Sequence, residues 1–375
     1  MIKVLIVFGT RPEAIKMAPL VKAFQQREKE VETKVCVTAQ HRQMLDQVLD
    51  FFAISPDYDL DLMRDKQSLH SITANVLMNI KPIVEEFKPD YVLVHGDTAT
   101  STAAALSAFY SGCKVVHIEA GLRTWNKYAP FPEEMNRQIT GRLADLHMAP
   151  TCVAKGNLLK EGVNENTIFV SGNTVIDALL SSVNILKDDQ TEEIKELGRH
   201  LNLEKEIILV TGHRRENFGQ GFINICTALK MIAEKNPLLD IVYPVHLNPS
   251  VQEPVNRILA NISNIKLISP LNYPAFVWLM ERSKLIITDS GGVQEEAPSL
   301  GKPVLVMRDT TERPEAVDAG TVLLVGTDIE KIVNTTQKLL SDENFYQKMS
   351  NQKNPYGDGA ASERIVNYIL EKTQK

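Results

Sequence analysis

Short runs of Val, Ile and Leu alternate with amphipathic stretches along the first half of the chain. The apolar runs predict strands over 4–8, 34–38, 91–95, 114–118 and 168–170. The stretches with helical periodicity are 13–26, 44–52, 69–87 with an interruption at Pro82, 101–110 and 133–144. Strands that are almost continuously apolar are covered on both faces, which is typical of a parallel sheet.

The same alternation starts again after a polar stretch at 183–206, which we expect to hold a helix near a domain junction. Strands are predicted over 207–211, 241–244, 265–268, 285–288, 304–307 and 321–325, with helices over 222–233, 250–259, 273–282 and 329–340. The pattern therefore predicts an α/β protein with two doubly wound domains, 1–172 and 173–360. A final helix in 361–375 is expected to pack back on the first domain. Ligands of such sheets bind beyond the carboxyl ends of the strands, and the expected site is a cleft between the domains.

Composition limits the classes of function that remain. The 375 residues are 43% hydrophobic and carry a formal net charge of −6, whereas a general nucleic-acid binder is more often basic. Four cysteines without CxxC or metal-ligand spacing indicate a reducing compartment, and the first apolar run is too short for a signal sequence or a membrane span. We expect a cytoplasmic protein that binds neither nucleic acid nor membrane.

The first predicted strand ends in Gly9-Thr10-Arg11-Pro12-Glu13, and Lys16 follows within the next helix. A helix N-terminus offers free N–H groups to an anion, and a guanidinium grips phosphate through two hydrogen bonds. The alternative is a plain turn with solvated charges. A dinucleotide fingerprint is excluded because the spaced G-x-G-x-x-G is absent.

Carboxylates follow two further strands of the first half. Asp97 comes after the strand at 91–95, Glu119 after the strand at 114–118, and Glu133 lies in a proline-rich turn before a helix. Asp97 could instead cap the next helix, and Glu133 could complement its helix dipole. Three carboxylates that reach one site favour acid–base chemistry over these structural roles.

The strand ends of the second half carry groups suited to a phosphate. His213 follows the strand at 207–211 beside two arginines, and His246 holds the equivalent place after the next strand. A protonated imidazole can donate to phosphate, although either histidine could be structural. The run Asp289-Ser290-Gly291-Gly292 opens a helix, with Glu296 one turn further on. Two glycines let the backbone approach a phosphate closely, and the Glu296 carboxylate could accept both ribose hydroxyls. The segment from Arg308 to Arg313 follows another strand and could close over the same site.

Six blocks in this order resemble the bacterial non-hydrolysing UDP-N-acetylglucosamine 2-epimerases. The blocks begin at Gly9, His95, His117, Pro132, Gly212 and Asp289, and the resemblance runs from Met1 to beyond Arg313. It implies a GT-B-like architecture of two Rossmann-like domains, a homodimer, and interconversion of UDP-N-acetylglucosamine and UDP-N-acetylmannosamine for surface polysaccharide synthesis. It also implies that no nicotinamide cofactor and no obligatory metal are needed.

The resemblance assigns roles to individual positions. The residues that it ties to catalysis are Asp97, Glu119, Glu133 and His213. The residues that it places around UDP are Arg11, Lys16, His213, Phe276, Ser290, Gly291, Gly292, Glu296 and Arg313, to which we add His246. Gln40, His41 and Gln43 match a motif that binds a second UDP-N-acetylglucosamine as an activator, and Lys66 stands where the family often has Arg. Leu271 replaces a Gln that is frequent before Phe276.

The chemistry implied by the resemblance is an elimination. The C2 proton of the sugar is not next to a carbonyl, so its removal is coupled to loss of UDP from C1, which gives 2-acetamidoglucal. UDP then adds back while a proton arrives on the opposite face. We expect burial to raise the pKa of the participating carboxyl toward neutrality. The alternatives are a hydrolysing epimerase that releases free N-acetylmannosamine, a GT-B glycosyltransferase, an inactive nucleotide-sugar sensor, and a related substrate such as a 2,3-diacetamido sugar nucleotide.

Overall fold

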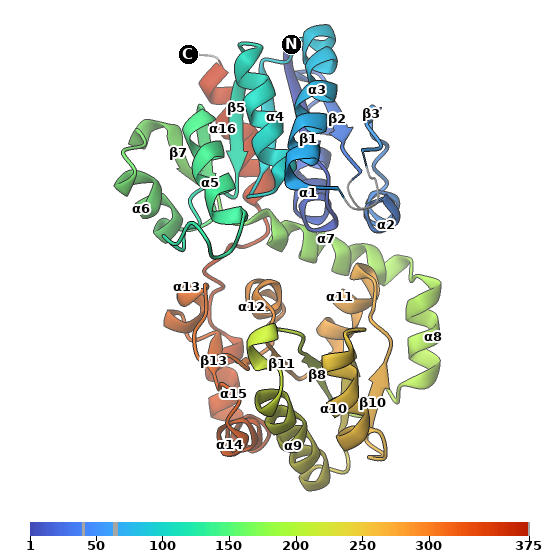
Figure 1. Ribbon diagram of the computed structural model, residues 1–375. Helices are drawn as coiled ribbons and strands as arrows, with labels where there is room; N and C mark the ends of the chain where they lie inside the picture. Colours follow the sequence, from blue (N-terminus) through green and yellow to red (C-terminus); the bar gives the residue numbers. More distant parts are fainter. Residues whose placement is uncertain (40–41, 63–66, 374–375) are drawn as a thin grey trace. The chain divides into compact units, whose positions relative to one another are not determined.

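The computed structural model describes residues 1–39, 42–62 and 67–373, and these form two compact units. One unit comprises Met1–Ala178 with Tyr356–Lys375, and the other comprises Leu179–Pro355. The domain boundaries expected at 172 and 360 lie a few residues from those of the units. Each unit is built around one parallel sheet with helices on both faces (Figure 1).

The sheet of the first unit has seven parallel strands in the order β3-β2-β1-β4-β5-β6-β7. Its strands are β1 (Ile2–Phe8), β2 (Val31–Val37), β3 (Tyr58–Asp59), β4 (Tyr91–His95), β5 (Lys114–Ile118), β6 (Leu146–Ala149) and β7 (Ile168–Val170). Its helices are α1 (Arg11–Gln25), α2 (Arg42–Phe51), α3 (Leu69–Phe87), α4 (Ala99–Tyr110), α5 (Glu133–Leu143), α6 (Cys152–Lys160), the start of α7 (Thr174–Asp188), and α16 (Ala361–Thr373). The strand order reverses direction between β1 and β4, which is where doubly wound sheets bind ligands.

The sheet of the second unit has six parallel strands in the order β10-β9-β8-β11-β12-β13, and its direction reverses between β8 and β11. Its strands are β8 (Ile207–Thr211), β9 (Asp240–Pro244), β10 (Ile265–Ile268), β11 (Leu285–Thr288), β12 (Val304–Val306) and β13 (Val322–Leu324). Its helices are the rest of α7, α8 (Glu192–His200), α9 (Gln220–Lys235), α10 (Pro249–Leu259), α11 (Tyr273–Arg282), α12 (Gly291–Glu296), α13 (Pro314–Asp318), α14 (Ile329–Ser341) and α15 (Glu343–Ser350).

The apolar runs that predicted the strands are the cores of the two units. All five residues of β4 are buried, as are the last five residues of β1. Alternate strand residues such as Leu5, Val7 and Val92 pack with α3 and α4 in one cluster, and the strand residues between them point to the other face. The prediction of two doubly wound parallel sheets is therefore confirmed.

Several elements differ from the prediction. The strands β3 and β6 and the helix α6 were not predicted, and α3 continues through Pro82 without the expected interruption. The polar stretch at 183–206 holds the end of α7 and all of α8. The strand β6 reads Leu-His-Met-Ala, which has no β-branched residue, so composition alone gave no strand signal there.

The last helix packs within the first unit. The α16 helix contacts α1, and the Arg27 guanidinium donates a hydrogen bond of 2.9 Å to the Asn367 amide oxygen. Among the described helices, none combines the length and the apolar character that crossing a bilayer requires.

Candidate functional site

Three predicted site residues of the first unit lie directly beyond the ends of β1, β4 and β5. These three strands are adjacent in the sheet, and β1 and β4 flank the point where its order reverses. These residues are Arg11, Asp97 and Glu119, respectively. The topology therefore brings together side chains that are more than one hundred residues apart in sequence.

Glu119 is the most constrained carboxylate of this group. Its backbone has φ 60°, a left-handed conformation that costs a non-glycine residue about 1–2 kcal/mol. Its carboxylate forms an ion pair with the Lys16 ammonium, accepts a hydrogen bond of 3.1 Å from the Asn173 amide, and lies 3.6 Å from His95 Nε2. Only 10% of the side chain is exposed, so these partners replace solvent. Sequence placed Lys16 with the phosphates, whereas the structure places its ammonium on Glu119.

The ionisation of Glu119 differs from the expectation that burial would raise its pKa. Burial does oppose the charge, but the nearby Lys16 ammonium and His95 outweigh it and hold the pKa of Glu119 well below its ordinary value. An opposite charge within hydrogen-bond distance favours the charged form of a carboxyl group. Glu119 is therefore a carboxylate anion in the folded protein.

Asp97 is held by an arginine from a different helix. Arg137 of α5 donates to the Asp97 carboxylate from Nε at 2.9 Å and lies 2.8 Å away at Nη2. The residue that caps α4 is Thr98, whose hydroxyl accepts from the Ser101 N–H at 3.0 Å. The alternative role of Asp97 as a helix cap is therefore wrong, and its carboxylate is paired with Arg137 instead.

The two glutamates at the start of α5 have different surroundings. Glu134 is fully buried and accepts hydrogen bonds from the backbone N–H groups of Thr124 and Trp125 at 3.0 and 3.1 Å. Burial opposes its charge, but these donors, with Gln138 and Arg137, lower the pKa of Glu134. Glu133 is half-buried, and no hydrogen bond or ion pair of its carboxylate involves the described residues. Glu134 thus fixes the proline-rich loop, whereas Glu133 does not.

Glu13 joins the turns after β1 and β4, a role that was not anticipated. One carboxylate oxygen accepts from the N–H groups of Gly9 and Thr10 at 3.1 and 2.8 Å, and the other accepts from the Thr98 and Ser101 hydroxyls at 2.7 and 3.0 Å. Glu13 is 2% exposed and completes a capping box with Thr10. The Thr-x-x-Glu spacing in the sequence was the signal for the capping box, but not for the link between the turns.

In the second unit, Asp289 organises the turn that bears His213. The Asp289 Oδ2 atom accepts from the backbone N–H groups of His213 and Arg214 at 2.8 Å each, and Oδ1 lies 3.6 Å from His213 Nδ1. Asp289 is fully buried, so its charge is balanced by these donors rather than by water. The sequence identified the motif that contains Asp289 but gave this residue no role.

The two predicted histidines of this unit lie together. The rings of His213 and His246 are stacked with centroids 5.3 Å apart and planes inclined by 16°. Burial lowers the pKa of His213; Asp289 opposes this shift, while His246 and Arg214 add to it. The protonated form expected from sequence is therefore disfavoured without a ligand, and a bound phosphate would favour it.

The two glycines that begin α12 have a structural reason beside the predicted functional one. A Cβ atom on Gly291 would lie 2.8 Å from the guanidinium carbon of Arg313, so this glycine makes room for the arginine. The buried Glu295 carboxylate accepts a hydrogen bond of 2.9 Å from Arg313 Nε. No side chain caps α12, whose N-cap residue is Ser290. A Cβ atom on Gly292 would meet no atom closer than 3.7 Å.

Glu296 and Phe276 lie on α12 and α11. Glu296 is 8% exposed and accepts a hydrogen bond of 3.4 Å from the hydroxyl of Tyr273, the first residue of α11. Phe276 is half-buried on the same helix, and the preceding Leu271 is also half-buried. Tyr273 is a further residue that orients a predicted site residue.

The predicted activator residues are only partly described. Gln43 is exposed at the start of α2, whereas Gln40, His41 and Lys66 lie outside the described residues. Within the described ranges, no three His, Cys, Asp or Glu side chains are grouped so that they could hold a metal ion.

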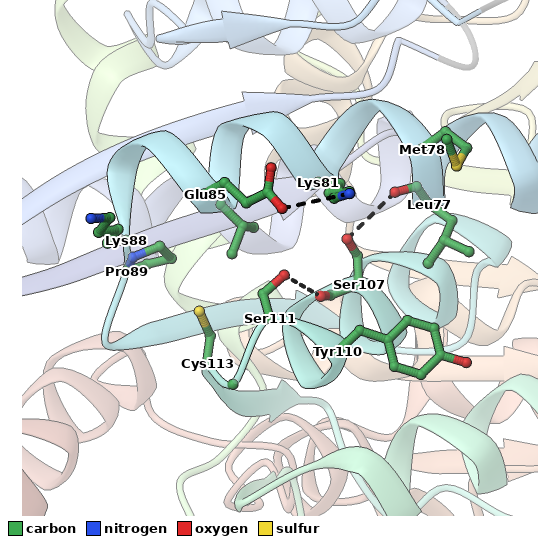
Figure 2. Close-up of a pocket in the computed structure, with 12 residues that line it drawn as sticks. Leu77, Met78, Lys81, Glu85, Lys88, Pro89, Ser107, Tyr110, Ser111 and Cys113 are labelled. Carbon is green, nitrogen blue, oxygen red and sulfur yellow. Dashed lines mark hydrogen bonds and ion pairs between the residues drawn. The ribbon is translucent and has the colours of Figure 1, made fainter.

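A surface cavity of about 870 Å³ lies between α3 and α4, and Figure 2 shows the residues around it. The Lys81 and Glu85 side chains lie 3.6 Å apart on one side, and Tyr110 and Cys113 lie on the other. The predicted site residues do not line this cavity.

Comparison with known proteins gives a consistent match over the whole chain. A family model described as UDP-N-acetylglucosamine 2-epimerase matches residues 22–370. The UDP-N-acetylglucosamine 2-epimerase of Campylobacter jejuni is 58% identical over 374 residues, which cover 98% of this chain and 97% of that protein. The crystal structure of the Neisseria meningitidis UDP-GlcNAc 2-epimerase bound to UDP-GlcNAc is 51% identical, has a TM-score of 0.88, and is matched over 99% of this chain and 100% of its own.

A glycosyltransferase from Rickettsia africae shares the fold at only 14% identity. Its TM-score is 0.65, over 100% of this chain and 99% of that chain. This match supports the GT-B-like fold and carries no information on activity. The near-complete match to epimerases does carry that information: the chain belongs to the UDP-N-acetylglucosamine 2-epimerase family and is an enzyme of the isomerase class.

Proposed function

We propose that this protein interconverts UDP-N-acetylglucosamine and UDP-N-acetylmannosamine without hydrolysis. The observation that carries the proposal is the buried, ionised Glu119 carboxylate at the end of β5, next to the strand β4 at the switch point of the first sheet, in a chain of this family. An epimerase needs a base at C2, and a carboxylate anion in a largely desolvated site is suited to that task.

In the proposed mechanism, a carboxylate takes the C2 proton while the C1–O bond breaks. The C2–H electron pair forms the C1–C2 double bond of 2-acetamidoglucal, and UDP leaves with the electrons of the C1–O bond. UDP then returns to C1, and an acid on the opposite face delivers a proton to C2. Glu119 is our first candidate for a base because its carboxylate is buried at a strand end and ionised before the reaction begins. Asp97 and Glu133 are the candidates for the second face.

The second unit is proposed to hold the nucleotide. His213, Ser290, Gly291, Gly292 and Arg313 would contact the diphosphate, with His246 against the His213 ring. Glu296 would accept the ribose hydroxyls, and Phe276 would lie beside the uracil. Cationic and N–H donors that strengthen as charge develops on UDP lower the barrier to its departure. Arg11 of the first unit stays a predicted anion-binding residue, whereas the Lys16 ammonium is paired with the Glu119 carboxylate.

Product analysis tests this function against its alternatives. We would incubate the protein with UDP-N-acetylglucosamine and follow the anomeric protons by NMR. We expect UDP-N-acetylmannosamine, with sugar and UDP still joined. Free N-acetylmannosamine with UDP would indicate the hydrolysing reaction, and turnover only with an added acceptor would indicate a glycosyltransferase. Either result would contradict the proposal.

The product would supply N-acetylmannosamine units for surface polysaccharide synthesis. Activation by a second UDP-N-acetylglucosamine stays a prediction from Gln40, His41, Gln43 and Lys66. Initial rates measured over a wide range of UDP-N-acetylglucosamine concentrations, with no product added, test this activation, because it makes the dependence of rate on concentration sigmoidal.

A homodimer is proposed to form through the α3–α4 surface. Met78 and Tyr110 are 66% and 70% exposed there, beside the Lys81–Glu85 pair. A patch with both charges and apolar groups can be self-complementary about a two-fold axis, because Lys81 of one copy can face Glu85 of the other. We therefore name a second copy of this chain as the occupant.

Sedimentation of Met78→Asp and Tyr110→Glu tests the dimer. We expect the wild type to sediment as a dimer and both variants to sediment as folded monomers. A wild type that stays monomeric, or variants that stay dimeric, would overturn this interface.

A further inference from the structure

The chain crosses from one unit to the other twice, and hydrogen bonds join the two crossing segments within the first unit. The first crossing lies within α7, because the first unit ends at Ala178. The chain returns at Tyr356, whose carbonyl accepts a hydrogen bond of 2.7 Å from the Asn173 N–H. A Cβ atom on Gly172 would lie 3.4 Å from the same carbonyl, so the two segments are in close contact.

A second set of hydrogen bonds joins the same two segments one turn further along α7. The Asp177 carboxylate accepts hydrogen bonds from the backbone N–H groups of Ala361 and Ser362 at 3.2 and 2.7 Å. These are the first residues of α16, so a side chain of α7 caps the helix that ends the chain. Asp177 is 7% exposed, which shields both bonds from water.

The side chain of Asn173 extends from the junction of these two segments to Glu119. Its Oδ1 atom accepts from the Val175 N–H at 3.1 Å, and its Nδ2 atom donates to Glu119 Oε2 at 3.1 Å. The orientation of the amide is thereby determined, because its oxygen faces an N–H group and its nitrogen faces a carboxylate. Asn173 is 3% exposed.

We propose that Asn173 is a positioning residue: it holds the Glu119 carboxylate and links it to the junction where the two crossing segments are hydrogen-bonded. This inference rests on the proposed function, in which Glu119 accepts the C2 proton. The amide adds a donor to the charged form of the carboxylate, in the same sense as Lys16 from α1 and His95 from β4. These are the titratable groups that contact Glu119 among the described residues.

The variant Asn173→Asp separates the positioning role from the local fold. An aspartate can still accept from the Val175 N–H, and its own N–H can still donate to Tyr356. The substitution replaces the amide nitrogen that donates to Glu119 with a carboxylate oxygen, which repels the Glu119 carboxylate. Because a hydrogen bond to a charged group is stronger than one between neutral groups, we expect kcat to fall about 10- to 100-fold while KM changes less than about threefold. The acidic limb of the kcat profile should move to higher pH.

Asn164→Asp is the matched control. Asn164 makes the same type of cap, accepting from the N–H of Asn166 at 3.0 Å, and it is exposed in the same unit. The charge change is identical, but the site is not touched, so kcat and its pH profile should stay those of the wild type. Asn173→Ser provides a second variant that keeps a capping hydroxyl, adds no charge and cannot reach Glu119. Unchanged kcat and pH profile in folded Asn173→Asp and Asn173→Ser would overturn the inference.

A readout that does not need turnover distinguishes this inference from the proposed function. The Glu119 carboxyl carbon can be titrated by NMR in protein labelled with 13C at the glutamate carboxyls, with Glu119→Gln assigning the resonance. We expect a higher apparent pKa in Asn173→Asp than in the wild type. If the wild type shows no epimerisation but this shift is present, the proposed function fails and the link stands. If epimerisation is present and the resonance titrates unchanged, the link fails.

Discussion

The two units have the same doubly wound topology but use their carboxylates differently. In the first unit, Asp97 and Glu119 lie at strand ends with cationic partners, Arg137 and Lys16. In the second unit, Asp289 and Glu295 are buried and hold other groups in place, namely the His213 turn and Arg313. The first unit thus places carboxylates paired with cations after β4 and β5, whereas the second uses carboxylates to fix donors.

This difference shows that the sheet provides positions and the turns provide the chemistry. Both units place candidate residues after the strands that flank the reversal, β1 and β4 in one and β8 and β11 in the other, and after the neighbouring strands β5 and β9. The fold alone does not distinguish an epimerase from a glycosyltransferase, since both are found on it. We propose that the distinction lies in Glu119 and its partners.

The strongest way to break the comparison is Glu119→Gln. A positioned base contributes about 100- to 10,000-fold to a rate, so we expect turnover to fall by about 1,000-fold. The affinity for UDP, measured by calorimetry, should change less than about threefold if nucleotide binding belongs to the second unit. Glu165→Gln, which removes an exposed partner of Lys155, is the control and should leave both quantities unchanged. An equal loss of UDP affinity and turnover would contradict the division between the units.

The next largest effect is expected from Lys16→Met. Removing one partner of a buried ion pair costs about 3 kcal/mol of unfolding free energy, because the other charge remains in place. The pKa of Glu119 is low in the folded wild type, so its contribution to stability is present above the ordinary carboxyl pKa and is lost as the pH falls through the folded value. The difference between variant and wild type should therefore be largest near neutral pH and should shrink in acid.

Urea unfolding at several pH values measures this difference. Lys155→Met is the matched control, since the Lys155–Glu165 pair is largely exposed and its loss should cost less than about 1 kcal/mol. Equal losses in the two variants would show that the Lys16–Glu119 pair is not a buried pair in solution.

A smaller effect sharpens the account of the second unit. Gly291→Ala would place a methyl group 2.8 Å from the Arg313 guanidinium carbon, so the arginine must move. We expect UDP affinity to fall about tenfold, which corresponds to about 1.4 kcal/mol. Gly198→Ala lies in a helix of the same unit with no atom within 4 Å and should leave affinity unchanged. Turnover at saturating substrate should change little in either variant, in contrast to Glu119→Gln.

Much of the fold could be predicted because each buried strand has a local apolar signal. The helices α3 and α11 have the predicted bounds, since their apolar periodicity is strong. The two-residue β3 and the His-containing β6 have no such signal and were missed. The helix α7 begins at Thr174, ahead of the polar stretch in which a helix was expected, because its first turn is buried by Tyr356 and α16.

The candidate site could be predicted as residue types but not as contacts. The sequence placed Asp97 and Glu119 at strand ends, and the structure agrees. It could not pair Lys16 with Glu119 across 103 positions, nor could it show that this pair lowers a pKa that burial alone would raise. The sequence also could not distinguish the surroundings of the adjacent Glu133 and Glu134. Only the packing shows that Glu134 is buried while Glu133 is half-buried.

The most direct measurement of the central claim is turnover of UDP-N-acetylglucosamine in deuterium oxide, followed at C2 by NMR. If carboxylates of the first unit remove and return the C2 proton, UDP-N-acetylmannosamine should carry deuterium at C2, and substrate re-formed from it should gain the label as equilibrium is approached. An epimerised product that keeps its original C2 proton throughout would contradict the account.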